Sequence, residues 1–207
     1  MEDLYQLCHC GSGKKLKFCC YKTFRESVNQ DPLVILQRAS TFKVCRCLIC
    51  KESLEAGLKA IVVARLLPNL RYLYASYIVD TYCLGLKDTL CRINADFDEI
   101  QHTLEFIPAE WIDCNYEVAR TIILGGIAYA SSLGFAPNED WSQSKYVIEF
   151  ERPYAKNYEF GREGKPFYVQ GPNDDADKIM RQLKNKTKGD FHYIISPEGF
   201  FEDAELL

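Results

Sequence analysis

Residues 60–80 read AIVVARLLPNLRYLYASYIVD, and this stretch decides the fold class. Two runs rich in β-branched and aromatic residues, 60–67 and 71–80, are separated by Pro68-Asn69-Leu70. Such runs favour strands, and the short turn between them predicts an antiparallel hairpin. In the second run Tyr72, Tyr74 and Ser76 alternate with Leu73, Ala75 and Tyr77, which indicates that one face of the hairpin is covered.

Helical patterns lie on both sides of this hairpin. Asp31-Pro32 is a helix-start signal, and residues 96–106 can form a second helix. From Asn115 an apolar stripe at helical spacing runs as far as Gly134, where the helix is expected to end. The adjacent pair Gly125-Gly126 inside this stripe predicts a close approach of the backbone to a neighbouring element.

The C-terminal third predicts a second hairpin, one more helix and a last strand. Residues 158–160 and 167–169 should pair around a turn at 161–164. Asn173 is expected to cap a helix with the inner stripe Ala176, Ile179, Met180 and Leu183, and residues 191–195 should form a closing strand. Hairpins and helices without regular strand–helix alternation favour an α+β fold.

Charge and hydropathy exclude several classes of protein. The 207 residues hold 25 Lys and Arg against 29 Asp and Glu, which argues against a surface that grips nucleic acid throughout, although a local basic patch remains open. No basic segment followed by an apolar run resembles a secretory signal, and no apolar run is long enough to span a bilayer. We therefore expect a cytoplasmic protein without membrane contact.

Ten cysteines in such a chain favour metal binding and buried thiols over a disulfide framework. Residues 8–20 read CHCGSGKKLKFCC, so two close pairs of cysteines flank one loop. Four thiolates surround a structural zinc tetrahedrally if the loop turns back sharply, as Gly-Ser-Gly permits. The predicted ligands are Cys8, Cys10, Cys19 and Cys20. All four positions are then filled, which leaves none for a catalytic water.

This segment resembles the SEC-C motif, the zinc-binding tail of the translocase motor SecA that also occurs in other bacterial proteins. The resemblance covers thirteen residues, with Cys20 standing where SecA commonly has His, and His9 is a bystander. It implies zinc binding and docking onto a protein partner or the ribosome. Residues 77–88 and 164–169 are similar to segments of SEC-C-bearing bacterial proteins, and this second likeness implies no catalytic residues.

The resulting domain plan has a zinc module at 1–22, a helical linker at 23–44 and an α+β domain at 45–207. We interpret the protein as an interaction module for a protein partner or for ribosomal RNA. The contacts would come from the basic loop, through Lys14, Lys15 and Lys17. A loop that only balances the negative charge of the zinc centre explains these lysines equally well.

A second cysteine cluster, Cys45-x-Cys47-x-x-Cys50, supplies only three ligands. A fourth would have to come from distant positions, which are Cys83, Cys91, Cys114 and His102. The incomplete set favours thiols that pack as small hydrophobic groups over a second metal site.

The alternative function is a metal-dependent nuclease. Asp80 ends a predicted strand and Asp88 follows a glycine-containing turn, a placement that can hold Mg²⁺ against phosphate. A third carboxylate would have to come from Asp98, Glu99 or Glu117. No nucleotide-binding, zinc-protease or hydrolase motif supports an enzyme.

Isolated histidines and the strand tyrosines have both structural and functional interpretations. His102 and His192 are expected to be hydrogen-bonded structural residues rather than catalytic bases. Tyr72, Tyr74 and Tyr77 could stack on bases beside Arg71, but tyrosines in strands more often serve packing, which is the interpretation we prefer.

Overall fold

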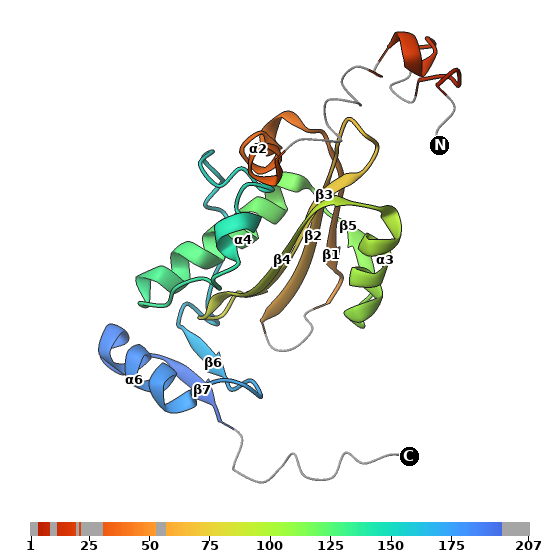
Figure 1. Ribbon diagram of the computed structural model, residues 1–207. Coiled ribbons are helices and arrows are strands. Elements are labelled where there is room, and N and C mark those ends of the chain that lie inside the picture. Colours follow the sequence, from red (N-terminus) through yellow and green to blue (C-terminus); the bar gives the residue numbers. More distant parts are fainter. Residues whose placement is uncertain (1–3, 9–11, 20, 22–30, 53–56, 196–207) are drawn as a thin grey trace, which may run out of the picture.

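The computed structural model describes residues 4–8, 12–19, 21, 31–52 and 57–195 (Figure 1). Its centre is a five-stranded antiparallel sheet in the order β4-β3-β2-β1-β5, with helices on both faces. The α+β fold expected from the sequence is confirmed. Among the described residues, none belongs to a helix both long and apolar enough for a bilayer crossing.

The central hairpin is the one that the sequence predicts. Strands β2 (Leu58–Leu66) and β3 (Tyr72–Asp80) pair antiparallel, with Ile61 opposite Tyr77 and Val63 opposite Ala75. Three further strands complete the sheet, which are β1 (Val44–Cys50), β4 (Gly85–Ala95) and β5 (Trp111–Asp113). The alternation in the second run predicted one covered face, but most of β2 and β3 is fully buried because helices cover both faces of the sheet.

One face of the sheet is covered by α4 (Tyr116–Ser132), which Asn115 caps by accepting a hydrogen bond from the Glu117 amide. The helix lies close to the sheet at its glycine pair. A Cβ added to Gly126 would lie 2.8 Å from Val79, and one added to Gly125 would lie 2.7 Å from the ring of Phe160. The close approach predicted at this pair is confirmed.

Shorter elements complete this layer. Asp31 caps helix α2 (Pro32–Gln37), because its side chain accepts a hydrogen bond from the Leu33 amide. The predicted helix start is therefore confirmed. Helix α2, the 3₁₀ turn η2 (Ala39–Thr41) and α5 (Trp141–Ser144) contribute side chains to the same core as α4. Ile35, Leu36, Ala39 and Phe42 are buried in the main core. The part of the expected linker from residue 32 onward therefore packs against the domain, and residues 23–30 lie outside the described residues.

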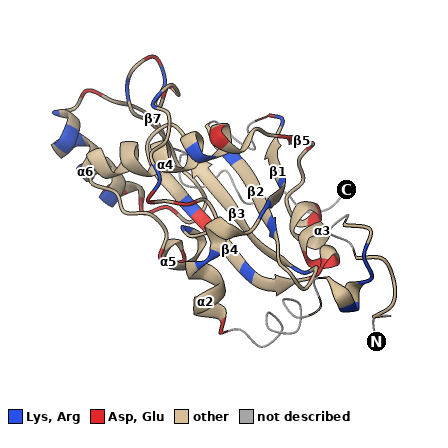
Figure 2. Ribbon diagram, turned by 90° about the horizontal axis from the view of Figure 1, so that it is seen from above, with Lys and Arg blue, Asp and Glu red and all other residues tan. Residues whose placement is uncertain are grey.

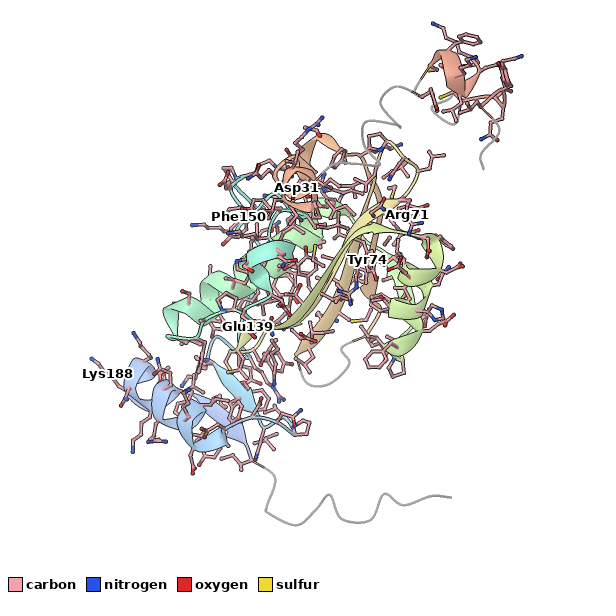
Figure 3. All side chains as sticks on the ribbon, viewed as in Figure 1. Asp31, Arg71, Tyr74, Glu139, Phe150 and Lys188 are labelled. Carbon is pink, nitrogen blue, oxygen red and sulfur yellow. The ribbon has the colours of Figure 1, made fainter. Side chains whose placement is uncertain are left out.

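The opposite face is covered by α3 (Phe97–Phe106). Asp96 and Glu99 form a reciprocal capping box at its start, which confirms the helix expected over 96–106. Ile100 packs on Val62 and Tyr74 in a smaller core, and Figure 3 shows Tyr74 between the sheet and this helix.

The C-terminal part is a β–α–β unit rather than a hairpin. Strand β6 (Phe167–Val169) pairs in parallel with β7 (His192–Ile194), and α6 (Ala176–Thr187) connects them. The closing strand is confirmed, but the predicted hairpin between 158–160 and 167–169 is wrong. The glycine turn at 161–164 does form, with a single bridge between Arg162 and Lys165, but residues 158–160 are not a strand.

The cap of α6 also differs from the expectation. Asp175, not Asn173, accepts a hydrogen bond from the Lys178 amide at the helix start. The predicted inner stripe is confirmed, because Leu183 is buried and its three companions pack against it. Acidic residues open α3 and basic residues close α6, as the helix dipole favours (Figure 2).

Candidate functional site

The N-terminal lobe is a small hairpin that brings the chain back on itself. Leu7 bridges Lys15 in antiparallel fashion, and the Cys8 amide donates to the Lys14 carbonyl at 2.7 Å. Between these arms Gly13 has a φ of +71°, a left-handed conformation that glycine adopts without a steric penalty. A zinc knuckle requires such a reversal of the chain between its two pairs of ligands.

Two of the four predicted zinc ligands lie in the described part of this lobe. Cys8 is 6% exposed, and Cys19 follows the 3₁₀ turn η1 (Leu16–Phe18). The Cys19 sulfur lies 3.1 Å from the hydroxyl of Ser12. Cys10 and Cys20 lie outside the described residues, as does His9, so the complete ligand set stays a prediction. Within the described ranges, no three His, Cys, Asp or Glu side chains are grouped so as to hold a metal.

The chemistry of the predicted ligand set suits a structural zinc. A hairpin arm carries Cys8 and a helical turn carries Cys19, while the chain between them reverses direction. A donor set made only of sulfur atoms suits zinc rather than magnesium or calcium. If bound, the ion would supply a structural crosslink and no catalytic position.

The outer surface of the lobe is both apolar and basic. Leu7 and Phe18 are each 68% exposed and Tyr5 is 54% exposed. The Lys17 ammonium donates to the Tyr5 hydroxyl at 3.0 Å, and the Lys15 and Lys17 ammonium groups lie 5.5 and 5.1 Å from the centre of the Tyr5 ring. The lobe therefore presents hydrophobic side chains next to concentrated positive charge.

Asp80, the first residue of the nuclease hypothesis, serves the turn after β3. One of its carboxylate oxygens accepts from the amides of Tyr82 (2.7 Å) and Cys83 (3.1 Å), and the residue is buried. Burial raises its pKa against the opposing effect of these amides. Asp88 is exposed on β4 opposite Ile78, and its carboxylate accepts from the Thr89 amide.

The candidates for a third carboxylate are engaged in helix starts. Glu99 belongs to the capping box of α3, where Asp98 is also part of the first turn. Glu117 bonds to Arg120 at 2.9 Å and to Arg152 at 2.5 Å. These contacts give each of Asp80, Glu99 and Glu117 a structural role of its own.

The second cysteine cluster is spread over the sheet. Cys47 and Cys50 are buried, whereas Cys45 is exposed and its sulfur donates to the Ala64 carbonyl at 3.3 Å. Residues three apart in a strand point to opposite faces, so Cys47 and Cys50 lie on different sides of β1. The interpretation as packed thiols is confirmed for these two residues. Cys83 is fully buried, as expected, and Cys91 and Cys114 are half-buried.

The strand tyrosines pack as expected, while the histidines do not. Tyr74 and Tyr77 are buried, and their hydroxyls bond to Thr103 and to the Ser144 carbonyl. His102 is 81% exposed beside Glu105, and His192 is exposed on β7. Both histidine side chains are exposed, so the hydrogen-bonded structural role expected of them stays a prediction.

Two buried arginines form a network that sequence reasoning missed. The Arg65 guanidinium donates to the carbonyls of Phe42 and Val147, to the Tyr116 hydroxyl and to the Glu149 carboxylate at 2.6 Å. The sequence does carry a signal for this network, because Arg65 interrupts the apolar run 60–67 of a central strand. Its donors are used by the protein itself, so the network is structural.

Arg120 makes a parallel set of bonds from the buried side of α4. It donates to four carbonyls of the segment 148–153 and to Glu117. This segment borders a hollow of about 290 Å³. The hollow is lined by Ser40, Tyr146, Glu149, Phe150, Glu151 and Arg152. Because Arg65 and Arg120 are satisfied by protein atoms, the hollow receives no charged donor from them.

Comparison with known proteins gives no match, since no family model, curated protein or solved structure is significantly similar to the chain. The likeness of residues 8–20 to the SEC-C motif therefore rests on those residues themselves.

Proposed function

We propose that the N-terminal lobe is a zinc-organised docking module that binds an acidic protein surface, and that the α+β domain carries it. The observation behind this proposal is the exposure of Leu7 and Phe18, each 68%, beside lysines on the same small lobe. Large exposed apolar side chains rimmed by polar groups are typical of interaction sites.

Zinc enters the proposal because the lobe has little core of its own. Cys8 and Leu16 are its buried apolar residues in the described segments 4–8 and 12–19. A unit of this size requires a staple to hold one conformation, and four thiolates around zinc would supply it. Lys14, Lys15 and Lys17 would then offset the double negative charge of a four-thiolate centre while their outer surfaces stay available to a partner.

An acidic protein fits this surface better than RNA does. Leu7 and Phe18 offer aliphatic and aromatic anchors, the kind of side chain that dominates protein interfaces. The lysines would steer a negatively charged partner towards those anchors. The Tyr5 ring lies under two ammonium groups, so it is a poorer platform for a stacked base.

A binding titration with defined probes tests the proposal. A fluorescent amphipathic helical peptide of Leu and Glu should bind the zinc-loaded chain, and Phe18→Ser should weaken that binding about tenfold, the loss of one anchor residue. Phe106→Ser is the matched control, because Phe106 is 89% exposed on α3, outside the lobe. It should leave the affinity unchanged.

A second titration separates protein from RNA. A labelled oligouridine of twelve nucleotides should bind at least tenfold more weakly than the peptide at the same salt concentration. Tighter binding of the oligouridine, or equal losses for Phe18→Ser and Phe106→Ser, would refute the proposal.

A further inference from the structure

Cys47 and Cys114 face each other across the edge of the sheet, although 67 positions separate them in the sequence. Strands β1 and β5 pair antiparallel, with Leu48 opposite Asp113 and Ile49 opposite Ile112. One further step of this register sets Cys47 opposite Cys114. The Cys114 amide donates to the Cys47 carbonyl at 2.9 Å, which shows that the pairing continues to this point.

The spacing suits a disulfide. Directly opposed residues of an antiparallel pair have Cα atoms about 4.5–5.5 Å apart. A disulfide accepts Cα separations of about 4.4–6.8 Å, so the backbone would need little movement. The two thiols also influence each other, since each shifts the pKa of the other.

The two cysteines differ in the way that a reactive and a resolving thiol differ. Cys114 is half-buried and directly precedes Asn115, the cap of α4, whereas Cys47 is 8% exposed and belongs to the main core. The hydrogen bond from Cys47 lowers the pKa of Cys114 to about 7. The same hydrogen bond, together with burial, raises the pKa of Cys47. When it is protonated, the Cys114 thiol donates a hydrogen bond to the Asn115 carbonyl oxygen at 3.4 Å.

We propose that Cys114 and Cys47 are a reversible redox pair, in which Cys114 reacts with a peroxide and Cys47 closes a disulfide. The Cys114 thiolate attacks one oxygen of hydrogen peroxide, the O–O bond breaks, and the products are a sulfenic acid on Cys114 and hydroxide, which takes up a proton. The Cys47 sulfur then attacks the sulfenic sulfur and displaces its hydroxyl group, which leaves with the Cys47 proton as water. Two thiols lose two electrons, the peroxide gains them, and two waters form.

The disulfide would tie β1 to the segment that enters α4. That segment also carries β5, the short edge strand, so oxidation would fasten the edge of the sheet to its neighbour. The other described thiols lack this combination of contact and exposure. Cys50 lies on the opposite face of β1, and burial raises the pKa of Cys91 to about 12.

Peptide mapping of the full chain tests the pair. Trypsin releases Cys114 on the peptide 93–120, where it is the single cysteine, and Cys47 on the peptide 47–51, which it shares with Cys50. After treatment with hydrogen peroxide and blocking of the remaining thiols, the two peptides should appear linked, with a mass about 2 Da below their sum. Dithiothreitol should separate them again.

Serine variants identify the partner of Cys114. Cys50→Ser should keep the link, whereas Cys47→Ser should lose it and leave a sulfenic acid on Cys114 that dimedone traps. Circular dichroism on both variants establishes that the fold is retained. A link through Cys50, or oxidation of Cys114 to sulfinic acid in the wild type without any linked peptide, would overturn the proposal.

Discussion

Replacing Arg120 by Met should destabilise the α+β domain strongly. Methionine keeps most of the volume of the arginine stem while removing every donor. The Arg120 side chain is 0% exposed, and its guanidinium bonds to the carbonyls of Ile148 (2.8 Å), Glu149 (3.1 Å), Arg152 (2.6 Å) and Pro153 (3.1 Å). The variant therefore tests whether one buried side chain holds the segment 148–153 in place.

The size of the effect follows from which carbonyls can reach water. Arg152 and Pro153 are exposed, so their carbonyls can be hydrated after the change. The Glu149 carbonyl keeps a hydrogen bond from the Arg152 amide at 3.0 Å, whereas the carbonyl of the fully buried Ile148 loses its donor. An unsatisfied buried acceptor costs about 1–3 kcal/mol, so the loss of the donor to the Ile148 carbonyl should cost about 2 kcal/mol. With a urea dependence of about 2 kcal/mol per molar, the unfolding midpoint should fall by about 1 M.

Urea unfolding followed by circular dichroism measures this shift. Arg152→Met is the matched control, because Arg152 is 44% exposed and its ion pairs with Glu117 and Glu149 face solvent. It should change the free energy of unfolding by less than about 1 kcal/mol. Equal midpoints for the two variants would refute the reasoning that Arg120 holds this segment.

Further predictions concern single side chains. Burial raises the pKa of Asp80, so ionisation of its carboxyl group opposes folding. The free energy of unfolding of the wild type should therefore fall relative to that of Asp80→Asn as the pH rises from about 4 to 7, and parallel curves of this free energy against pH would contradict this. Cys114 should be alkylated at pH 7 at least about fivefold faster than Cys45, because partial burial of the Cys45 thiol raises its pKa although the residue as a whole is exposed. Faster labelling of Cys45 in peptide mapping would contradict this. Gly134→Ala should lower the melting temperature more than Gly189→Ala, since both glycines have a left-handed φ but only the first would place a Cβ against α6, at 1.9 Å from a side-chain nitrogen. Equal melting temperatures would show that the contact has no effect.

The parts of the fold that could be predicted are those with strong local signals. The β2–β3 hairpin follows from two β-branched runs around Pro68, and α4 from a cap at Asn115 and an apolar stripe. The glycine pair of α4 was informative because a helix tolerates two glycines poorly unless another element needs the space. These signals act over a few residues, which is why sequence alone contains them.

The errors arose where pairing depends on distant segments. The three residues of β6 are compatible with either neighbour, and the parallel partner β7 lies across a whole helix. Asn173 and Asp175 are both good caps, and tertiary context selects Asp175. The contact between Cys47 and Cys114 depends on the register of β1 and β5, for which neither segment carries a sequence signal.

The candidate zinc site could be predicted from spacing alone, whereas the apolar surface around it could not. Paired cysteines across a glycine-containing loop indicate four ligands, because the chemistry of zinc limits the choice. The exposure of Leu7 and Phe18 depends on how the lobe folds, and a sequence does not state which apolar residues remain outside a small core.

The metal content of the purified chain tests the central claim most directly. Inductively coupled plasma mass spectrometry should find one zinc per chain in the wild type and little in Cys8→Ser or Cys19→Ser, while Cys83→Ser, a buried thiol of the α+β domain, should keep the full amount. Wild-type protein without zinc, or equal zinc in all three variants, would contradict a metal-organised lobe.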